Sequence, residues 1–192
     1  MSGTYRSAKC IVAFIDTALG RVLDTHTLGA GLGILVKQAI NWANAGDTAD
    51  EIESKIINLA SREKIFFIVN TLEYLHKGGR TGVAQKFLGS MLHIKPILQL
   101  QNGIIEPAGS QRTKKKIINL LLTLIDDKCP KNSSSHLSIM HREVEAEAKE
   151  FALQVSEITG ILDTPIYEIP GAILVYSGPG TLGISFFVYQ EQ

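Results

Sequence analysis

The stretch that decides the fold is "IKPILQLQNGIIEPAGSQR", residues 94–112. Two runs rich in apolar residues flank Asn102-Gly103. This dipeptide is a strong signal for a two-residue hairpin turn, because both of its positions tolerate a positive φ. The stretch therefore predicts two antiparallel strands, and we expect them to open a second sheet.

Helix and strand patterns alternate before this hairpin, which favours α/β layers over a helix bundle or a β-sandwich. The continuous apolar run "KIFFIVN" (Lys64 to Asn70) is typical of a buried strand in a parallel sheet. We also expect a short strand at "RVLDT" (Arg21 to Thr25). Helices are predicted at Gly3 to about Ile15, at 29–46, from Asp47 or Thr48 to about 63, in a short segment ending at Lys77, and at 81–92.

After the hairpin the pattern predicts helices at Thr113 to Asp127 and Glu143 to Thr159. Strands are expected at "HLSIMHR", "IYEIP", "AILVY" and "GISFFVYQ". We interpret the chain as two α/β parts, a parallel-sheet domain at 1–93 and a two-layer domain with a mixed sheet at 94–192.

Composition excludes several classes of protein. The 192 residues are 45% hydrophobic, and 19 basic residues balance 19 acidic ones, so no overall field attracts nucleic acid or an anionic membrane. The longest apolar run, 117–125, is shorter than the ~18 residues of a membrane span. With no signal peptide recognised, we expect a cytoplasmic protein whose cysteines, Cys10 and Cys129, stay reduced.

The chain shows no motif for metal, nucleotide or nucleophilic chemistry. Its five histidines have no metal-ligand spacing, and a Walker loop, a GxSxG elbow and a complete GxGxxG fingerprint are missing. We therefore expect no metal site, no cofactor and no enzymatic activity.

Two short segments suggest anion binding. In "SGTY" (Ser2 to Tyr5) the serine is either an ordinary N-cap or, with the free N–H groups of the helix, a donor to a carboxylate or phosphate. In "HKGGR" (His76 to Arg80) two glycines suit a helix end that needs positive φ. Arg80 follows this helix end. Either its planar guanidinium group binds a carboxylate, or it is an ordinary surface arginine after a helix cap.

Two further segments lie in the second half. In "YSGPGTLG" (Tyr176 to Gly183) the sequence Gly178-Pro179-Gly180 predicts a rigid turn, which either exposes backbone donors to a ligand or is a simple turn. "QRTKKK" (Gln111 to Lys116) puts cations at a helix start, where the dipole disfavours them, so we expect negative charge nearby.

Taken in order, these segments resemble the DegV family of bacterial fatty-acid-binding proteins, the acyl-carrying subunits of fatty acid kinase. The resemblance rests on "SGTYRSA", "VLDTHTLGAGLG", "NTLEYLHKGGR", "LGSMLHIKPILQLQNGIIEP", "QRTKKK" and "SGPGTLGISFF". It implies a three-layer parallel-sheet domain and a two-layer mixed-sheet domain with the acyl chain between them. Family members have a strand and a threonine-containing segment before "SGTY", so the chain resembles a member truncated at its N-terminus.

The resemblance also implies a site. Ser2 and Arg80 would bind the fatty-acid carboxylate, with the backbone of Gly3, Gly79, Gly178 and Gly180 near the ligand. Arg112 would contact the ATP-binding kinase subunit. Tyr176 stands where the family has a histidine, and its hydroxyl can donate one hydrogen bond to the carboxylate.

The function that this resemblance implies is binding of a long-chain fatty acid such as palmitate or oleate and its presentation to a separate kinase. The alternative is a truncated homologue that binds no lipid and acts as a structural or oligomeric protein, associating through apolar surface. An enzyme for a small phosphorylated substrate ranks last, because it rests on fold analogy alone.

Overall fold

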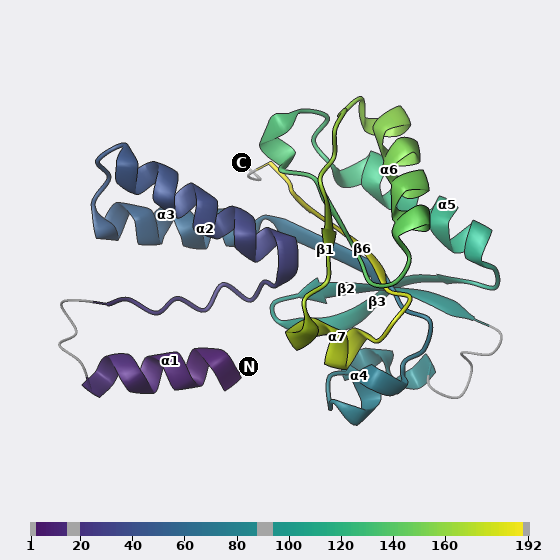
Figure 1. Cartoon of the computed structure of the whole chain (residues 1–192), viewed down its shortest axis with the longest axis horizontal. Helices are drawn as coiled ribbons and strands as arrows, with labels where there is room; N and C mark the ends of the chain where they lie inside the picture. Colours follow the sequence, from purple (N-terminus) through teal and green to yellow (C-terminus); the bar gives the residue numbers. More distant parts are fainter. Residues whose placement is uncertain (1–2, 15–19, 88–93, 190–192) are drawn as a thin grey trace.

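The computed structural model of the chain describes residues 3–14, 20–87 and 94–189 (Figure 1). Its strands within these ranges form one six-stranded mixed sheet, in the order β3-β2-β1-β6-β4-β5. The strands are β1 (Glu63–Ile68), β2 (Lys95–Gln101), β3 (Ile104–Gln111), β4 (Ser138–His141), β5 (Ile166–Glu168) and β6 (Leu182–Phe187). Among the strand pairs of the described residues, β4 and β5 alone are parallel, so the predicted α/β class and mixed sheet are confirmed.

The hairpin predicted within residues 94–112 is present, but it pairs with β1 in one sheet, so the expectation that it opens a second sheet is wrong. Strands β2 and β3 pair antiparallel, and Gln101 is opposite Ile104. Asn102 and Gly103 have φ values of 51° and 74°, as a type I′ turn requires. The register shifts once, between Ile97 and Leu98.

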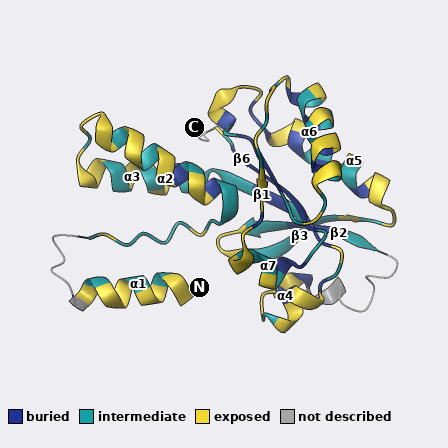
Figure 2. Cartoon of the chain, viewed as in Figure 1, coloured by how far each residue is buried: buried dark blue, intermediate teal, exposed yellow. Residues whose placement is uncertain are grey.

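Two helices cover one face of the sheet and enclose the main core (Figures 1 and 2). These are α5 (Lys114–Lys128) and α6 (Glu145–Thr159), both at their predicted positions. Buried side chains of the two helices pack against buried side chains of β1, β2, β4 and β6. The helices contribute Ile117, Leu121, Ile125, Phe151 and Val155, and the strands contribute Phe66, Ile97, Ile139, Ile184 and Phe186.

Short elements cover part of the other face, and the N-terminal elements extend away from it. Helix α4 (Glu73–Lys77), the 3-10 helix η2 (Gly82–Phe87) and helix α7 (Gly171–Ser177) lie below the sheet in Figure 1. Helices α2 (Gly29–Asn44) and α3 (Ala49–Ser61) form an antiparallel pair that projects to one side, and α1 (Gly3–Phe14) lies apart from the sheet. Thr48 caps α3 in a capping box with Glu51.

Three sequence predictions of secondary structure are wrong. Strand β1 is antiparallel to both of its neighbours, so the apolar run reflects burial by two layers rather than a parallel sheet. "RVLDT" joins no strand. "AILVY" lies in α7, where packing against α4 outweighs the strand preference of its β-branched residues.

The predicted helix at 81–92 is observed as a 3-10 helix up to Phe87, and the rest of it lies outside the described residues. The domain division at residue 93 stays a prediction. Among the described residues of the first part, β1 is the strand that enters the sheet.

Candidate functional site

Arg80 leaves the end of α4 through a Schellman cap. The Arg80 N–H donates to the Leu75 carbonyl (2.8 Å) and the Gly79 N–H donates to the His76 carbonyl (2.9 Å). Gly79 takes a φ of +67°, whereas Gly78 keeps a helical φ of −78°. The predicted helix end is therefore confirmed, and Gly79 alone supplies the left-handed residue.

Gly78 serves a different purpose, because the ring of Tyr176 from α7 lies against it. A Cβ atom added at Gly78 would lie 2.3 Å from Tyr176 Cδ1. The contact is reciprocal, since a Cβ atom at Gly178 would lie 2.4 Å from Cδ2 of Tyr74 in α4. The two helices thus exchange equivalent contacts: Tyr176 of α7 packs against Gly78 at the end of α4, and Tyr74 of α4 packs against Gly178 at the end of α7.

The guanidinium group of Arg80 lies over the Tyr176 ring, with 4.6 Å from Cζ to the ring centroid. This distance is within the range of cation–π contacts. Arg80 is exposed, and its Nη1 donates to the Gly78 carbonyl. It makes no ion pair within the described part of the chain, so its remaining donors are available to an external anion.

The turn after α7 does not offer the free backbone donors that the sequence suggested. Gly178 and Gly180 have φ values of 74° and 77°. The Gly178 N–H donates to the Leu174 carbonyl (2.8 Å), and the Gly180 N–H donates to the Arg142 carbonyl (2.9 Å). Because proline has no N–H, the whole Gly-Pro-Gly turn has its backbone donors satisfied or absent.

Arg112 lies at the same end of the sheet as this turn. It follows β3 directly, the turn precedes β6, and Asn70 follows β1. Strands β1 and β3 run antiparallel to β2 and β6. The segments that follow β1 and β3 therefore lie at the same end of the sheet as the segments that precede β2 and β6. Arg112 is exposed there and forms no ion pair in the described ranges.

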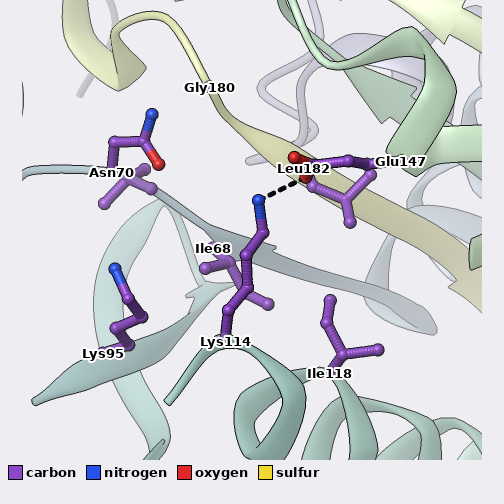
Figure 3. A pocket seen from close by; sticks show the side chains of 9 residues that line it. Ile68, Asn70, Lys95, Lys114, Ile118, Glu147, Gly180 and Leu182 are labelled. Carbon is purple, nitrogen blue, oxygen red and sulfur yellow. Dashed lines mark ion pairs between the residues drawn. The ribbon is translucent and has the colours of Figure 1, made fainter. Parts of the chain in front are cut away.

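A small cavity of about 20 Å³ lies between the turn and the start of α5 (Figure 3). Asn70 and Gly180 line one side of the cavity, and Nδ2 of Asn70 donates a hydrogen bond to the Pro179 carbonyl (3.4 Å). Lys114 lies opposite and pairs with Glu147 of α6 at 2.5 Å. Glu147 supplies the negative charge that was predicted near the basic run.

The apolar surroundings are divided between two regions. One is a buried cluster of Ile65, Met140 and Ile169 beneath the start of α2, with Ile173 of α7 packed against it. The other is a hollow of about 290 Å³ beside α2 and α3, lined by Leu23, Thr25, Leu32, Leu35, Val36, Ala39, Ile40 and Ile56 together with Arg21.

One predicted site residue, Gly3, is not brought to this cluster, and another cannot be placed. Ser2 lies outside the described residues. Gly3 begins α1, which is separate from α4 and α7 in Figure 1. The structure thus joins Arg80, Gly79, Tyr176, Gly178 and Gly180 in one place, with Arg112 on the same edge of the sheet.

Sequence reasoning missed Tyr74 and Asn70. Asn70 ends an apolar strand, a position where polar residues often serve a site, and that signal was available. Tyr74 had no such signal, because its contact is with a glycine more than 100 residues away.

A family model described as "Uncharacterised protein, DegV family" matches residues 1–188. The chain belongs to the DegV family. A DegV domain-containing protein of Listeria monocytogenes is 32% identical over 188 residues, which cover 97% of this chain and 66% of that protein. This chain therefore spans just under two thirds of the relative's length.

Two solved DegV structures share the fold. A DegV family protein from Eubacterium eligens, loaded with heptadecanoic acid, matches with a TM-score of 0.85 and 26% identity over 98% of this chain and 70% of its own. A DegV family protein from Thermus thermophilus, described for its fatty acid binding, matches with a TM-score of 0.86 and 27% identity over 98% and 67%. In the described part of this DegV chain, no helix is long and apolar enough to cross a membrane.

Proposed function

We propose that this chain binds a long-chain fatty acid, with Arg80 holding the carboxylate, and presents it to a separate ATP-dependent kinase. The observation that carries the proposal is an exposed arginine, stacked on Tyr176 and without an acidic partner among the described residues, in a family with fatty-acid-loaded members. Ser2 and the backbone of Gly3 belong to the proposed site on the strength of the family resemblance.

In the proposed complex the acyl chain supplies most of the affinity, and the carboxylate fixes the orientation of the ligand. Each buried CH₂ contributes about 0.8 kcal/mol, so a long chain contributes on the order of ten kcal/mol before the costs of ordering. A carboxylate that leaves water needs a cation and hydrogen bonds to stay charged. The apolar surfaces around Ile173 and beside α2 suit the tail, and Arg80 suits the head group.

Native mass spectrometry of the purified protein tests binding. We expect a co-purified or added acyl chain, palmitate or oleate, on the wild-type chain. Arg80→Ala should weaken palmitate binding about tenfold or more, because it removes the charge that pairs with the carboxylate. Lys115→Ala is the matched control, since it removes an exposed cation of the basic run and should leave binding unchanged.

Arg112 distinguishes binding from presentation. Arg112→Ala should retain palmitate and lose acyl-phosphate production when a fatty acid kinase is added. Reduced palmitate binding by this variant would contradict a role at the kinase contact. No acyl chain on the wild-type protein, purified or after addition of fatty acid, would contradict the proposed function.

A second candidate function is structural, with the chain associating through apolar surface and binding no lipid. The exposed side chains of Leu32, Val36 and Ile40 on α2 and of Ile57 on α3 support it, with exposed fractions of 42% to 56%. Light scattering with and without palmitate separates this candidate from the first.

A further inference from the structure

The Tyr176 ring has one packed position. On the protein side it packs with a cluster of buried residues from α4, η2, β2 and the segment between β1 and α4, namely Val69, Leu72, Leu75, Ala84 and Leu98. Gly78 lies against its edge so closely that no other residue type fits without a shift. The ring therefore offers a fixed flat surface to the guanidinium group of Arg80 at 4.6 Å.

Arg80 has little else to hold its side chain. Its backbone N–H donates to the Leu75 carbonyl, but the side chain is exposed and, within the described residues, makes one hydrogen bond, to the Gly78 carbonyl. A long exposed side chain with so few contacts samples many rotamers, and a ligand must then order it at a cost in affinity. Stacking on a fixed ring removes part of that cost in advance.

Stacking on the Tyr176 ring also leaves the N–H donors of the Arg80 guanidinium group free to bind a carboxylate. The five N–H donors of a guanidinium group point outward in its plane, whereas the cation–π contact uses its face. One Nη1 donor is taken by Gly78, and the others can form the paired hydrogen bonds that a carboxylate accepts. The tyrosine hydroxyl is not needed for this arrangement.

We propose that Tyr176 is a positioning residue, whose ring rather than its hydroxyl group holds the Arg80 fork ready for a carboxylate. This inference rests on the proposed function, because it takes Arg80 as the carboxylate-binding residue. It replaces the role suggested by the sequence, a hydrogen bond from the Tyr176 hydroxyl to the ligand.

Binding of palmitate and of 1-hexadecanol tests the proposal, because the two probes share a chain and differ in the carboxylate. Tyr176→Leu keeps an apolar side chain on the buried cluster and removes the aromatic face. We expect its palmitate affinity to fall about threefold to tenfold, with hexadecanol affinity unchanged. Tyr176→Phe, which keeps the ring and removes the hydroxyl group, should retain the palmitate affinity of the wild-type chain.

The side-chain NMR signals of Arg80 supply a readout that is independent of ligand. A guanidinium over an aromatic ring has its Hε resonance shifted upfield, and this shift should persist in Tyr176→Phe and disappear in Tyr176→Leu. Circular dichroism melting confirms that both variants fold.

The outcomes separate the two proposals. Equal loss of palmitate affinity in both variants would overturn the inference in favour of the hydroxyl group. Full palmitate affinity in Tyr176→Leu would overturn it as well. If the wild-type chain binds no palmitate at all, the proposed function fails and the role of Tyr176 fails with it, whatever the NMR signals show.

Discussion

Glu63 begins strand β1, and its carboxyl group lies beside hydroxyl groups and forms no ion pair with the described residues. Thr27 and Ser185 donate hydrogen bonds to it, the latter at 2.9 Å. Burial raises the pKa of Glu63 to about 7, and the two hydrogen bonds offset only part of this effect. A Cβ atom at Gly31 of α2 would overlap the carboxyl group, so this residue also fits α2 closely to the sheet.

The raised pKa makes Glu63 a source of pH-dependent stability. A group that is more basic in the folded state contributes stability at pH values below its unfolded pKa, and this contribution is lost as pH rises through the folded value. Between about pH 5.5 and about pH 8.5 the wild-type chain should lose on the order of 2 kcal/mol from this group. Glu63→Gln should remove that loss, as measured by urea unfolding at the two pH values.

Glu51 is the matched control for this experiment. A backbone hydrogen bond from Thr48 lowers the pKa of Glu51, so its contribution is lost only as pH falls through that lowered value. Glu51→Gln should therefore shift the unfolding free energy equally at about pH 5.5 and about pH 8.5. If Glu63→Gln gives the same parallel shift, its carboxyl group does not titrate as proposed.

At the scale of elements, α4 and α7 are short helices that hold each other by exchanged glycine–tyrosine contacts. Five and seven residues are too few for a stable helix in isolation, so tertiary contacts must maintain both. Arg80 follows α4, and Tyr176 lies in the last turn of α7. The alignment of the proposed carboxylate site thus depends on how closely the two helices approach.

Gly78→Ala tests that dependence. The added methyl group meets the Tyr176 ring, and overpacking of this kind costs about 1 to 3 kcal/mol of stability. It should also displace the ring from Arg80 and reduce the upfield shift of the Arg80 Hε resonance. Urea unfolding and NMR check the two effects on the same samples.

Gly33→Ala is the control within a helix. Nothing lies within 4 Å of a Cβ atom at this position in α2, so alanine should stabilise the chain by about 0.5 to 1 kcal/mol. If Gly78→Ala and Gly33→Ala change the free energy of unfolding equally, the close approach of Tyr176 to Gly78 does not affect stability.

At the scale of the molecule, local signals in the sequence predicted the elements that have strong caps and turns. The Asn102-Gly103 turn, the α3 cap at Thr48 and the helix end at Gly79 are examples, because each depends on a few adjacent residues. Helices α5 and α6 were predicted equally well from their apolar periodicity.

Features that depend on distant contacts were not predictable in the same way. The antiparallel pairing of β1 is set by β2 and β6, and an apolar run does not reveal the direction of its neighbours. Helix α7 was predicted as a strand because its residues favour strands locally, whereas its packing against α4 depends on a segment about 100 residues away. At the candidate site the family pattern pointed to Arg80 and Tyr176. It did not reveal the stacking between them or the internal pairing of the Gly178 and Gly180 donors, because both depend on contacts between distant segments.

The exposed stripe on α2 gives the last prediction. Leu32, Val36 and Ile40 recur every four residues and so lie along one face of the helix, beside the hollow of about 290 Å³. If this face associates with a second copy, the wild-type chain should show about twice the mass of one chain by light scattering, and the double variant Val36→Lys/Ile40→Lys should show the mass of one chain.

Leu153→Lys is the control, because Leu153 is an exposed leucine on α6, away from this stripe. A monomeric wild-type chain would contradict the structural candidate, whereas a dimer that palmitate dissociates would indicate that tail and second copy compete for one apolar surface.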